Sequence, residues 1–127
     1  MRISRDQARE YFLHHSQQLY GITPDNLPDD PFEYWARGGV CGVLHQMPAP
    51  GVWMVHIAVK PQHWGGLVAD AKAELAAFWA DRTPSRIIGW TPAKFRAALA
   101  FSRRVGFVED GRMNLPDGEV IMSGWRA

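Results

Sequence analysis

The stretch WMVHIAVKPQHWGGLVADAKAEL, residues 53–75, joins a β-branched apolar segment to a helical pattern through a proline and two glycines. Its first part predicts a strand over Val52–Val59. The apolar spacing after the glycines predicts a helix over Gly66–Ala80 with one buried face. A loop that leads into a helix presents unpaired backbone N–H groups and the positive end of the helix dipole, which favours an anion such as phosphate. Paired glycines are also common in ordinary turns, so both interpretations stay open.

A second apolar segment, RIIGW at Arg86–Trp90, follows this helix and predicts a short buried strand. A strand, a helix and a second strand in this order normally form a right-handed parallel crossover. We therefore expect Val52–Val59 and Arg86–Trp90 to lie side by side and parallel, with their carboxyl ends at the same edge of the sheet.

The N-terminal part of the chain has the pattern of an amphipathic helix over Arg5–Tyr20. Ser4 and Gln7 form a capping-box pattern at its start, and Gly21 supplies its end. Residues at helical spacing define its apolar face: Ala8, Tyr11, Phe12, His15 and Leu19. The proline-rich, acidic segment 22–32 then predicts a surface loop, with a substrate-facing flap as the alternative.

The remaining segments complete the fold pattern. Strands are predicted over Phe32–Ala36 and Val40–Met47, and short turns imply an antiparallel meander that ends in Val52–Val59. A helix over Ala93–Arg104 precedes a hairpin whose turn contains Pro-Asp-Gly at 116–118. The expected fold class is α+β, a mixed and mostly antiparallel sheet with one central parallel crossover and flanking helices.

Length and charge restrict the class of protein. At 127 residues the chain fits one domain, residues 1–127. Fourteen basic residues against thirteen acidic ones leave a net charge of +1, so a nucleic-acid partner is not expected. The charged N-terminus is unlike a signal peptide, and no apolar stretch approaches the length of a membrane span. We therefore expect no membrane partner and a cytoplasmic protein.

Cysteine and histidine positions argue against a metal site. Cys41 is the single cysteine and lies in an apolar run, which excludes an internal disulfide and predicts a core position in a reducing compartment. Four histidines fall outside any metal-ligand spacing and have no accompanying carboxylate cluster: His14, His15, His45 and His63. No metal is therefore expected.

Two motifs carry a family resemblance. AALAFSRRVGFVEDGRM, residues 97–113, is similar to the late helix of the GNAT N-acetyltransferase superfamily and to the Gly-Phe that opens its next strand, here Gly106 and Phe107. IAVKP, residues 57–61, is similar to the end of that family's central strand. The order of elements resembles the family from the first helix to the last hairpin, with its usual first strand missing or very short. The chain resembles in particular the small phage-encoded members.

The resemblance implies acetyl-CoA as a co-substrate that lies where two parallel strands separate. Pantetheine would follow the central strand at Ile57, Ala58 and Val59. The pyrophosphate would lie on the following helix start, whose corresponding positions are Trp64, Gly65, Gly66, Leu67, Val68 and Ala69.

This helix start departs from the family pattern, which is arginine or glutamine, two residues, glycine, one residue, then glycine or alanine. Trp64 replaces the basic or amide residue, Leu67 replaces the central glycine, and Ala69 fits. Lys60 or Arg103 could supply positive charge instead, with solvated surface positions as the alternative.

Two positions correspond to the family's catalytic groups. A glutamate often lies three residues before the valine that closes the central strand, and His56 has that position. An imidazole with a reference pKa of ~6.5 can accept a proton from an ammonium, whereas a histidine in an apolar strand is often only a core residue. The family's tyrosine, four residues before Gly106, corresponds to Ser102, which either hydrogen-bonds the departing sulfur or only faces its helix. Both alternatives stay open for each residue.

The sequence thus favours an acetyl-CoA-dependent N-acetyltransferase that acts on a primary amine of a small molecule or a protein. The alternative is a catalytically degenerate relative that keeps the fold as a binding or regulatory protein. A nucleic-acid-binding accessory protein that uses Arg96, Arg103 and Arg104 is a weaker third hypothesis. The acceptor, and homodimer formation through the terminal hairpin, stay open.

Overall fold

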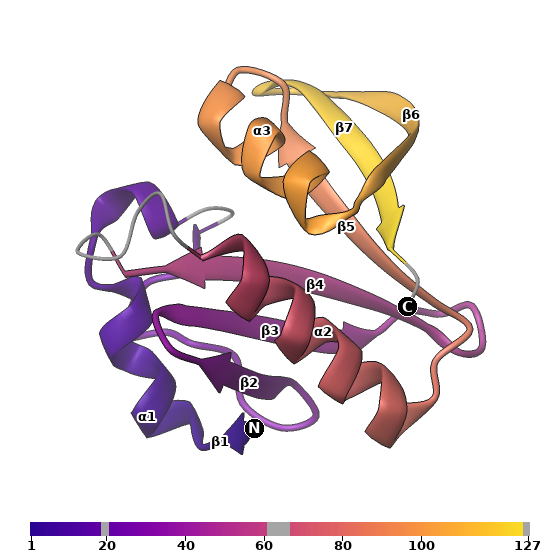
Figure 1. Cartoon of the computed structure of the whole chain (residues 1–127). Coiled ribbons are helices and arrows are strands. Elements are labelled where there is room, and N and C mark those ends of the chain that lie inside the picture. The colour runs from indigo at the N-terminus through magenta and orange to yellow at the C-terminus, as the bar shows by residue number, and fades with distance from the viewer. Residues whose placement is uncertain (19–20, 61–66, 126–127) are drawn as a thin grey trace.

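The computed structural model describes residues 1–18, 21–60 and 67–125, which form a seven-stranded sheet with helices on both faces (Figure 1). The strand order is β1-β2-β3-β4-β5-β7-β6. The strands are β1 (Arg2–Ile3), β2 (Glu33–Arg37), β3 (Val40–Gln46), β4 (Val52–Val59), β5 (Arg86–Pro92), β6 (Val108–Leu115) and β7 (Gly118–Trp125). Only β4 and β5 pair in parallel among the described strands. The predicted mixed α+β sheet with one parallel crossover is confirmed.

Two longer helices, α2 (Val68–Arg82) and α3 (Arg96–Val105), cover one face of the sheet (Figure 1). The core beneath them includes Phe78, Ile87 and Val105, all of which are almost fully buried. Trp35 and Trp53 contact Phe78 edge-on, with ring centroids 5.4 and 5.0 Å away. These helices pack against both halves of the sheet and hold them together.

The opposite face of the sheet carries a short N-terminal helical segment. It consists of α1 (Arg5–Ala8) and two 3-10 turns, η1 (Arg9–Phe12) and η2 (His15–Gln17). Its own core joins Phe12 to Cys41 and neighbouring strand residues. Cys41 is 0% exposed, and burial raises the pKa of its thiol to about 12, so its predicted core position is confirmed.

The first helix is shorter than predicted. The capping box at its start is present, since Gln7 N–H donates to Ser4 Oγ over 3.1 Å and Ser4 N–H donates to Gln7 Oε1 over 2.9 Å. The chain then leaves the helical path at His14, whose backbone is extended and whose Nδ1 accepts the Ser16 N–H. Local side-chain bonds of this kind compete with helix hydrogen bonds. His15, which was predicted on the apolar face, is consequently exposed.

The other elements agree with the prediction to within a few residues at their ends. β4 has the predicted bounds, whereas α2 and α3 each begin two or three residues later. α3 ends at Val105, and the cap residue Gly106 has φ 116° and donates its N–H to the carbonyls of Ser102 and Arg103. The Gly-Phe motif therefore marks a left-handed helix cap, a conformation that favours glycine.

The parallel pair β4 and β5 separates soon after it begins. Its register covers three residue pairs and ends with Met54 opposite Ile88. Beyond that point β4 stays paired with β3 as far as Val59, and β5 stays paired with β7 as far as Pro92. Figure 1 shows the two strands diverging toward their carboxyl ends. Each strand thus follows a different half of the sheet, which leaves unpaired strand edges between them.

Candidate active site

Backbone hydrogen bonds determine which way the amides of β4 point. Lys60 donates its N–H to the Gly39 carbonyl over 2.9 Å, on the β3 side. Because amide direction alternates along a strand, the N–H groups of Ile57 and Val59 point the other way, toward β5. Pairing with β5 has already ended at Met54. The diverging strands therefore present backbone donors to the space between them.

One of these donors is already hydrogen-bonded to Gln17. Its side-chain Oε1 accepts the Val59 N–H over 2.9 Å. The neighbouring Gln18 holds the segment in place, since its Nε2 donates to the Phe12 carbonyl over 2.8 Å. The η2 turn thus places the Gln17 carboxamide against the last residue of β4.

His56 lies on the face of β4 that carries the N-terminal segment. Its ring stacks on Phe12, with ring centroids 6.0 Å apart, and its Nε2 lies 3.3 Å from the Gln17 carbonyl oxygen. Burial lowers the pKa of His56 below 6.5, and the bond to Gln17 opposes that shift only in part. His56 is therefore neutral at pH 7, which is the protonation state that a general base requires.

Ser102 lies on the other side of the sheet from His56. It is half-buried on α3, and its carbonyl accepts the N–H groups of Gly106 and Phe107 in the helix cap. The structure does not place Ser102 and His56 on one face. A group that spanned the gap between β4 and β5 would be needed to reach both.

The start of α2 has the features of an anion site only in part. Leu67, which replaces the family's central glycine, has φ −111°, a value that any residue adopts, and its side chain is 5% exposed. The helix has no side-chain cap, so the first amides at Val68 and Ala69 are not satisfied by a capping side chain. Asp70 adds a negative charge to the first turn. Trp64, Gly65 and Gly66 lie outside the described residues.

The cation proposed at Lys60 has another partner. Its Nζ donates to Glu10 Oε1 over 2.8 Å and lies 4.6 Å from the centroid of the Tyr11 ring. Lys60 thus joins β4 to η1, on the face opposite α2. This contact favours a structural role for Lys60 over a role in binding pyrophosphate.

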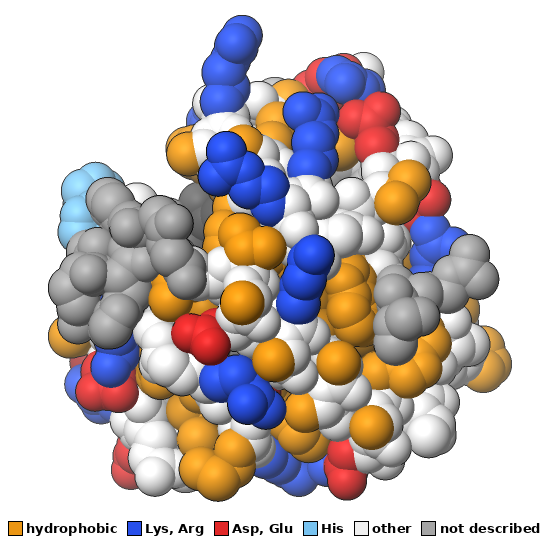
Figure 2. Space-filling view, in the orientation of Figure 1, with side chains coloured by type: hydrophobic (Ala, Val, Ile, Leu, Met, Phe, Trp, Pro, Cys, Tyr) orange, Lys and Arg blue, Asp and Glu red, His pale blue; other side chains and the backbone are white. Residues whose placement is uncertain are grey.

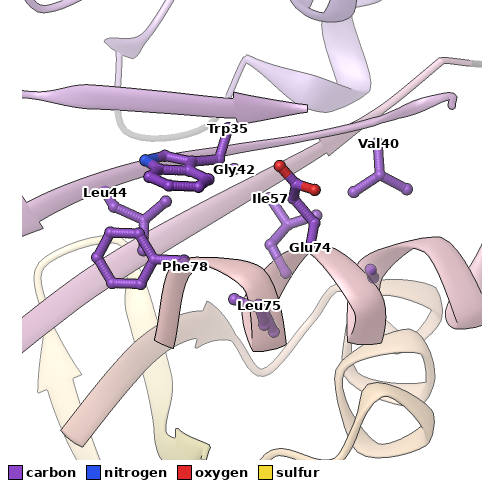
Figure 3. A pocket seen from close by; sticks show the side chains of 9 residues that line it. Trp35, Val40, Gly42, Leu44, Ile57, Glu74, Leu75 and Phe78 are labelled. Carbon is purple, nitrogen blue, oxygen red and sulfur yellow. The ribbon is translucent and has the colours of Figure 1, made fainter. Parts of the chain in front are cut away.

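A small cavity lies between the sheet and α2 (Figure 3). Its volume of about 10 Å³ suits at most a single water molecule. Figure 3 shows Glu74 reaching from α2 toward the strands beside Ile57. Glu74 accepts a hydrogen bond from Arg37 Nε over 3.2 Å, so its carboxylate is paired. This cavity is a packing feature and does not extend the candidate site.

Neither a metal-ion site nor a membrane-spanning helix is found in the described part of the chain. Residues 1–18, 21–60 and 67–125 contain no group of three His, Cys, Asp or Glu side chains placed to hold a metal ion. Within the same ranges, no helix has the length and hydropathy required to cross a bilayer.

Sequence reasoning did not identify Gln17. It was expected within a continuous helix, and no motif connects it to a strand residue 42 positions later. The signal that was present is the run His14-His15-Ser16-Gln17, whose polar residues cannot extend an apolar helix face.

Comparison with solved structures supports the fold. No family model and no curated protein matches the chain. Among solved structures, a variant of the spermidine N-acetyltransferase of Vibrio cholerae has a TM-score of 0.72 at 14% identity, over 98% of this chain and 92% of that one. A GNAT-family acetyltransferase of Bacillus anthracis has a TM-score of 0.60 at 13% identity, over 68% of this chain. The ribosomal-protein-S5-alanine acetyltransferase of Vibrio fischeri has a TM-score of 0.60 at 9% identity.

The fold is therefore that of the GNAT acetyltransferases. The chain covers 57% of the Bacillus anthracis structure and 52% of the Vibrio fischeri structure, so it spans little more than half of these two proteins. At these identities the likeness establishes the architecture, and function depends on the site.

Proposed function

We propose that the protein is an acetyl-CoA-dependent N-acetyltransferase that acts on a primary amine. The observation that carries this proposal is the divergence of β4 and β5 after the Met54–Ile88 pair, with the amides of Ile57 and Val59 facing the opening. Backbone donors aimed at a position where an oxyanion develops are a principal means of catalysing acyl transfer.

The thioester supplies an activated acyl group when it is bound, and the chain's own groups then act on it. An amide N–H of Ile57 or Val59 donates to the carbonyl oxygen as it gains negative charge. His56 accepts a proton from the attacking ammonium, directly or through water, so that the nitrogen becomes nucleophilic. The C–N bond forms as the C–S bond breaks, and the nitrogen, which is cationic after the attack, loses its second proton to water. The departing thiolate takes a proton from water, either directly or through Ser102, which water then reprotonates. A free thiol has a pKa of only ~8.5, so this last step needs little assistance.

In this proposal the acceptor amine and the sulfur of the thioester lie on opposite faces of the sheet. His56 is on the face of the N-terminal segment, and Ser102 is on the face of α2 and α3. The acceptor amine would approach from the His56 side. The sulfur and the rest of the cofactor would lie on the Ser102 side, and the carbonyl would lie in the opening between them.

The start of α2 supports cofactor binding through its backbone. The proposal assigns the pyrophosphate to amides between Gly65 and Ala69, of which Val68 and Ala69 are the described helical ones. The φ of −111° at Leu67 is one that any residue adopts, and its side chain is buried, which is compatible with a ligand on the backbone amides of this turn. The proposal keeps Trp64 and Gly66 as further contacts.

The acceptor is proposed by chemistry only. Two of the similar structures are named for acetylation of spermidine and of the alanine of a ribosomal protein, which are amines of a small molecule and of a protein. Both types remain candidates here.

A specific observation favours a second function, a catalytically degenerate binding protein with this fold. Gln17 holds the Val59 N–H that the thioester would use. His56 is half-buried and stacks on Phe12, and Asp70 places a negative charge in the first turn of α2, where the proposed pyrophosphate site lies. In this alternative the N-terminal segment closes the opening permanently.

A thermal-shift titration with acetyl-CoA distinguishes the two functions. A ligand at a hundred times its dissociation constant stabilises a fold by about 2.7 kcal/mol, which gives a readily measured shift. The enzyme proposal also requires release of free CoA thiol in the presence of an amine panel that includes polyamines and N-terminal alanine peptides. A shift without thiol release for any amine would support the binding protein, and no shift at millimolar acetyl-CoA would remove the cofactor from the proposal.

A further inference from the structure

A groove of about 440 Å³ runs between α3 and the terminal hairpin. Three arginines line it, Arg96 and Arg103 from α3 and Arg112 from β6. Its remaining lining is apolar and consists of Ala93, Leu99 and Ile121. The volume falls within the range of small-molecule sites.

The groove is separate from the opening between β4 and β5. An α-helix turns 100° per residue, so Arg96, Leu99 and Arg103 share one side of α3. Phe101 and Val105, which pack into the core with α2, lie on roughly the opposite side. The groove therefore lies on the side of α3 that faces away from the core shared with α2. The inference below does not depend on the proposed acetyl-CoA site.

The arginines of the groove differ in how they are paired. Arg112 Nη1 donates to Glu119 over 2.8 Å, and its Nη2 donates to Glu109 over 3.3 Å. No ion pair joins Arg96 or Arg103 to any residue that the structure describes. Two unpaired guanidinium groups beside a third are mutually repulsive, and an anion between them would relieve that repulsion.

The distribution of charge around the groove indicates the size of the anion. Figure 2 shows lysine and arginine side chains gathered over α3, with acidic side chains toward the terminal hairpin. The positive area ends at the hairpin, where Glu109 and Glu119 pair with Arg112. A nucleic-acid strand follows a long positive surface, which this short groove does not provide. A compact ligand fits it better.

We propose that this groove binds a small phosphate ester with an apolar or aromatic body, of the nucleotide class. The planar guanidinium groups of Arg96 and Arg103 bind phosphate oxygens in pairs of hydrogen bonds. The floor formed by Leu99 and Ile121 accepts the apolar body. Arg112 is held by its two carboxylates at the far wall and adds a third donor group.

Calorimetric titration with AMP tests this proposal, with adenosine and inorganic phosphate as probes that each lack one half of the ligand. AMP should bind saturably. Adenosine and inorganic phosphate should each bind more weakly than AMP, by about tenfold or more. Arg96→Gln and Arg103→Gln should each weaken AMP binding by about tenfold, since each removes charge-assisted hydrogen bonds. Arg104→Gln is the matched control, because Arg104 is exposed on the same helix but does not line the groove.

Three results would overturn the proposal. One is equal weakening in all three variants, which would show a general charge effect. Another is adenosine binding as tightly as AMP. The third is tighter binding of a single-stranded oligonucleotide than of AMP, with steep salt dependence, which would assign the arginines to nucleic acid. All three arginines are exposed, so the variants should fold, and their circular dichroism and melting curves should match the parent protein.

Discussion

The side-chain oxygen of Gln17 accepts the backbone N–H of Val59 at 2.9 Å, across 42 positions of sequence. This contact joins the N-terminal segment to the end of the central strand. Because the same N–H faces the opening between β4 and β5, Gln17 and a thioester carbonyl would compete for one donor.

Replacing Gln17 by Ala should therefore strengthen acetyl-CoA binding. A neutral hydrogen bond contributes about 0.5–1.5 kcal/mol net, so the dissociation constant should fall by roughly two- to tenfold. Gln18→Ala is the control, since the side chain of Gln18 donates to the Phe12 carbonyl and not to a strand carbonyl. Calorimetry with acetyl-CoA measures both variants. An equal effect in the two would show that loosening of the N-terminal segment, and not release of the Val59 amide, governs binding.

Acid should destabilise the fold through His56. Burial lowers its pKa below the unfolded value of 6.5, so the unfolded state binds more protons once the pH falls below 6.5. The stability present above pH 6.5 is then lost as the pH falls through the folded pKa. Denaturant unfolding between about pH 7 and about pH 5 should show a smaller loss in His56→Gln than in the parent protein. His45→Gln, at a partly exposed histidine of β3, is the matched control for removing a histidine from the sheet.

A buried carboxylate supports the junction of β2 and α2. Glu33 is 9% exposed, accepts the Trp35 indole N–H over 3.0 Å, and binds Arg82 Nε through both oxygens at 3.1 Å. Glu33→Gln should cost about 2 kcal/mol of unfolding free energy, because it removes the charge partner of Arg82. Asp81→Asn removes the other carboxylate beside Arg82, but that side chain is 53% exposed. Its cost should stay within about 0.5 kcal/mol, and equal costs in chemical denaturation would contradict this assignment.

Gly106 should be more sensitive to substitution than Gly118, the turn glycine of the terminal hairpin. Its φ of 116° strains any other residue, and an added Cβ would lie 3.1 Å from the Trp125 indole nitrogen. Gly118 has a similar φ of 128°, with nothing within 4 Å of an added Cβ. Gly118→Ala should therefore cost about 1 kcal/mol and Gly106→Ala about 2 kcal/mol or more. If thermal unfolding gave the same loss for both, the contact with Trp125 would have no energetic role.

The sequence predicted the parts of the fold that depend on local pattern. β4 has its predicted bounds because its residues, all apolar except His56, are buried or half-buried along its whole length. The Ser4–Gln7 capping box is also local and is present. The predicted continuation of that helix was wrong, because the His14 side chain accepts the Ser16 N–H at a point where the helix would have no apolar face to bury.

The candidate site was less accessible from the sequence. The positions of His56 and Ser102 were available from a motif, but their placement on opposite faces follows from strand alternation and helix packing together. The contact between Gln17 and Val59 depends on how the N-terminal segment crosses the sheet, which no local pattern encodes. The roles of His56, Ser102 and the helix start remain proposals that binding and activity must test.

The most direct test of the account is the response of the Ile57 and Val59 amides to acetyl-CoA in two-dimensional nitrogen–proton NMR spectra. If acetyl-CoA enters the opening between β4 and β5, these two amide signals should shift saturably, and the Gln17 side-chain signals should change at the same ligand concentrations. Saturable binding that leaves both amides unchanged, or no response at millimolar acetyl-CoA, would contradict the proposed site.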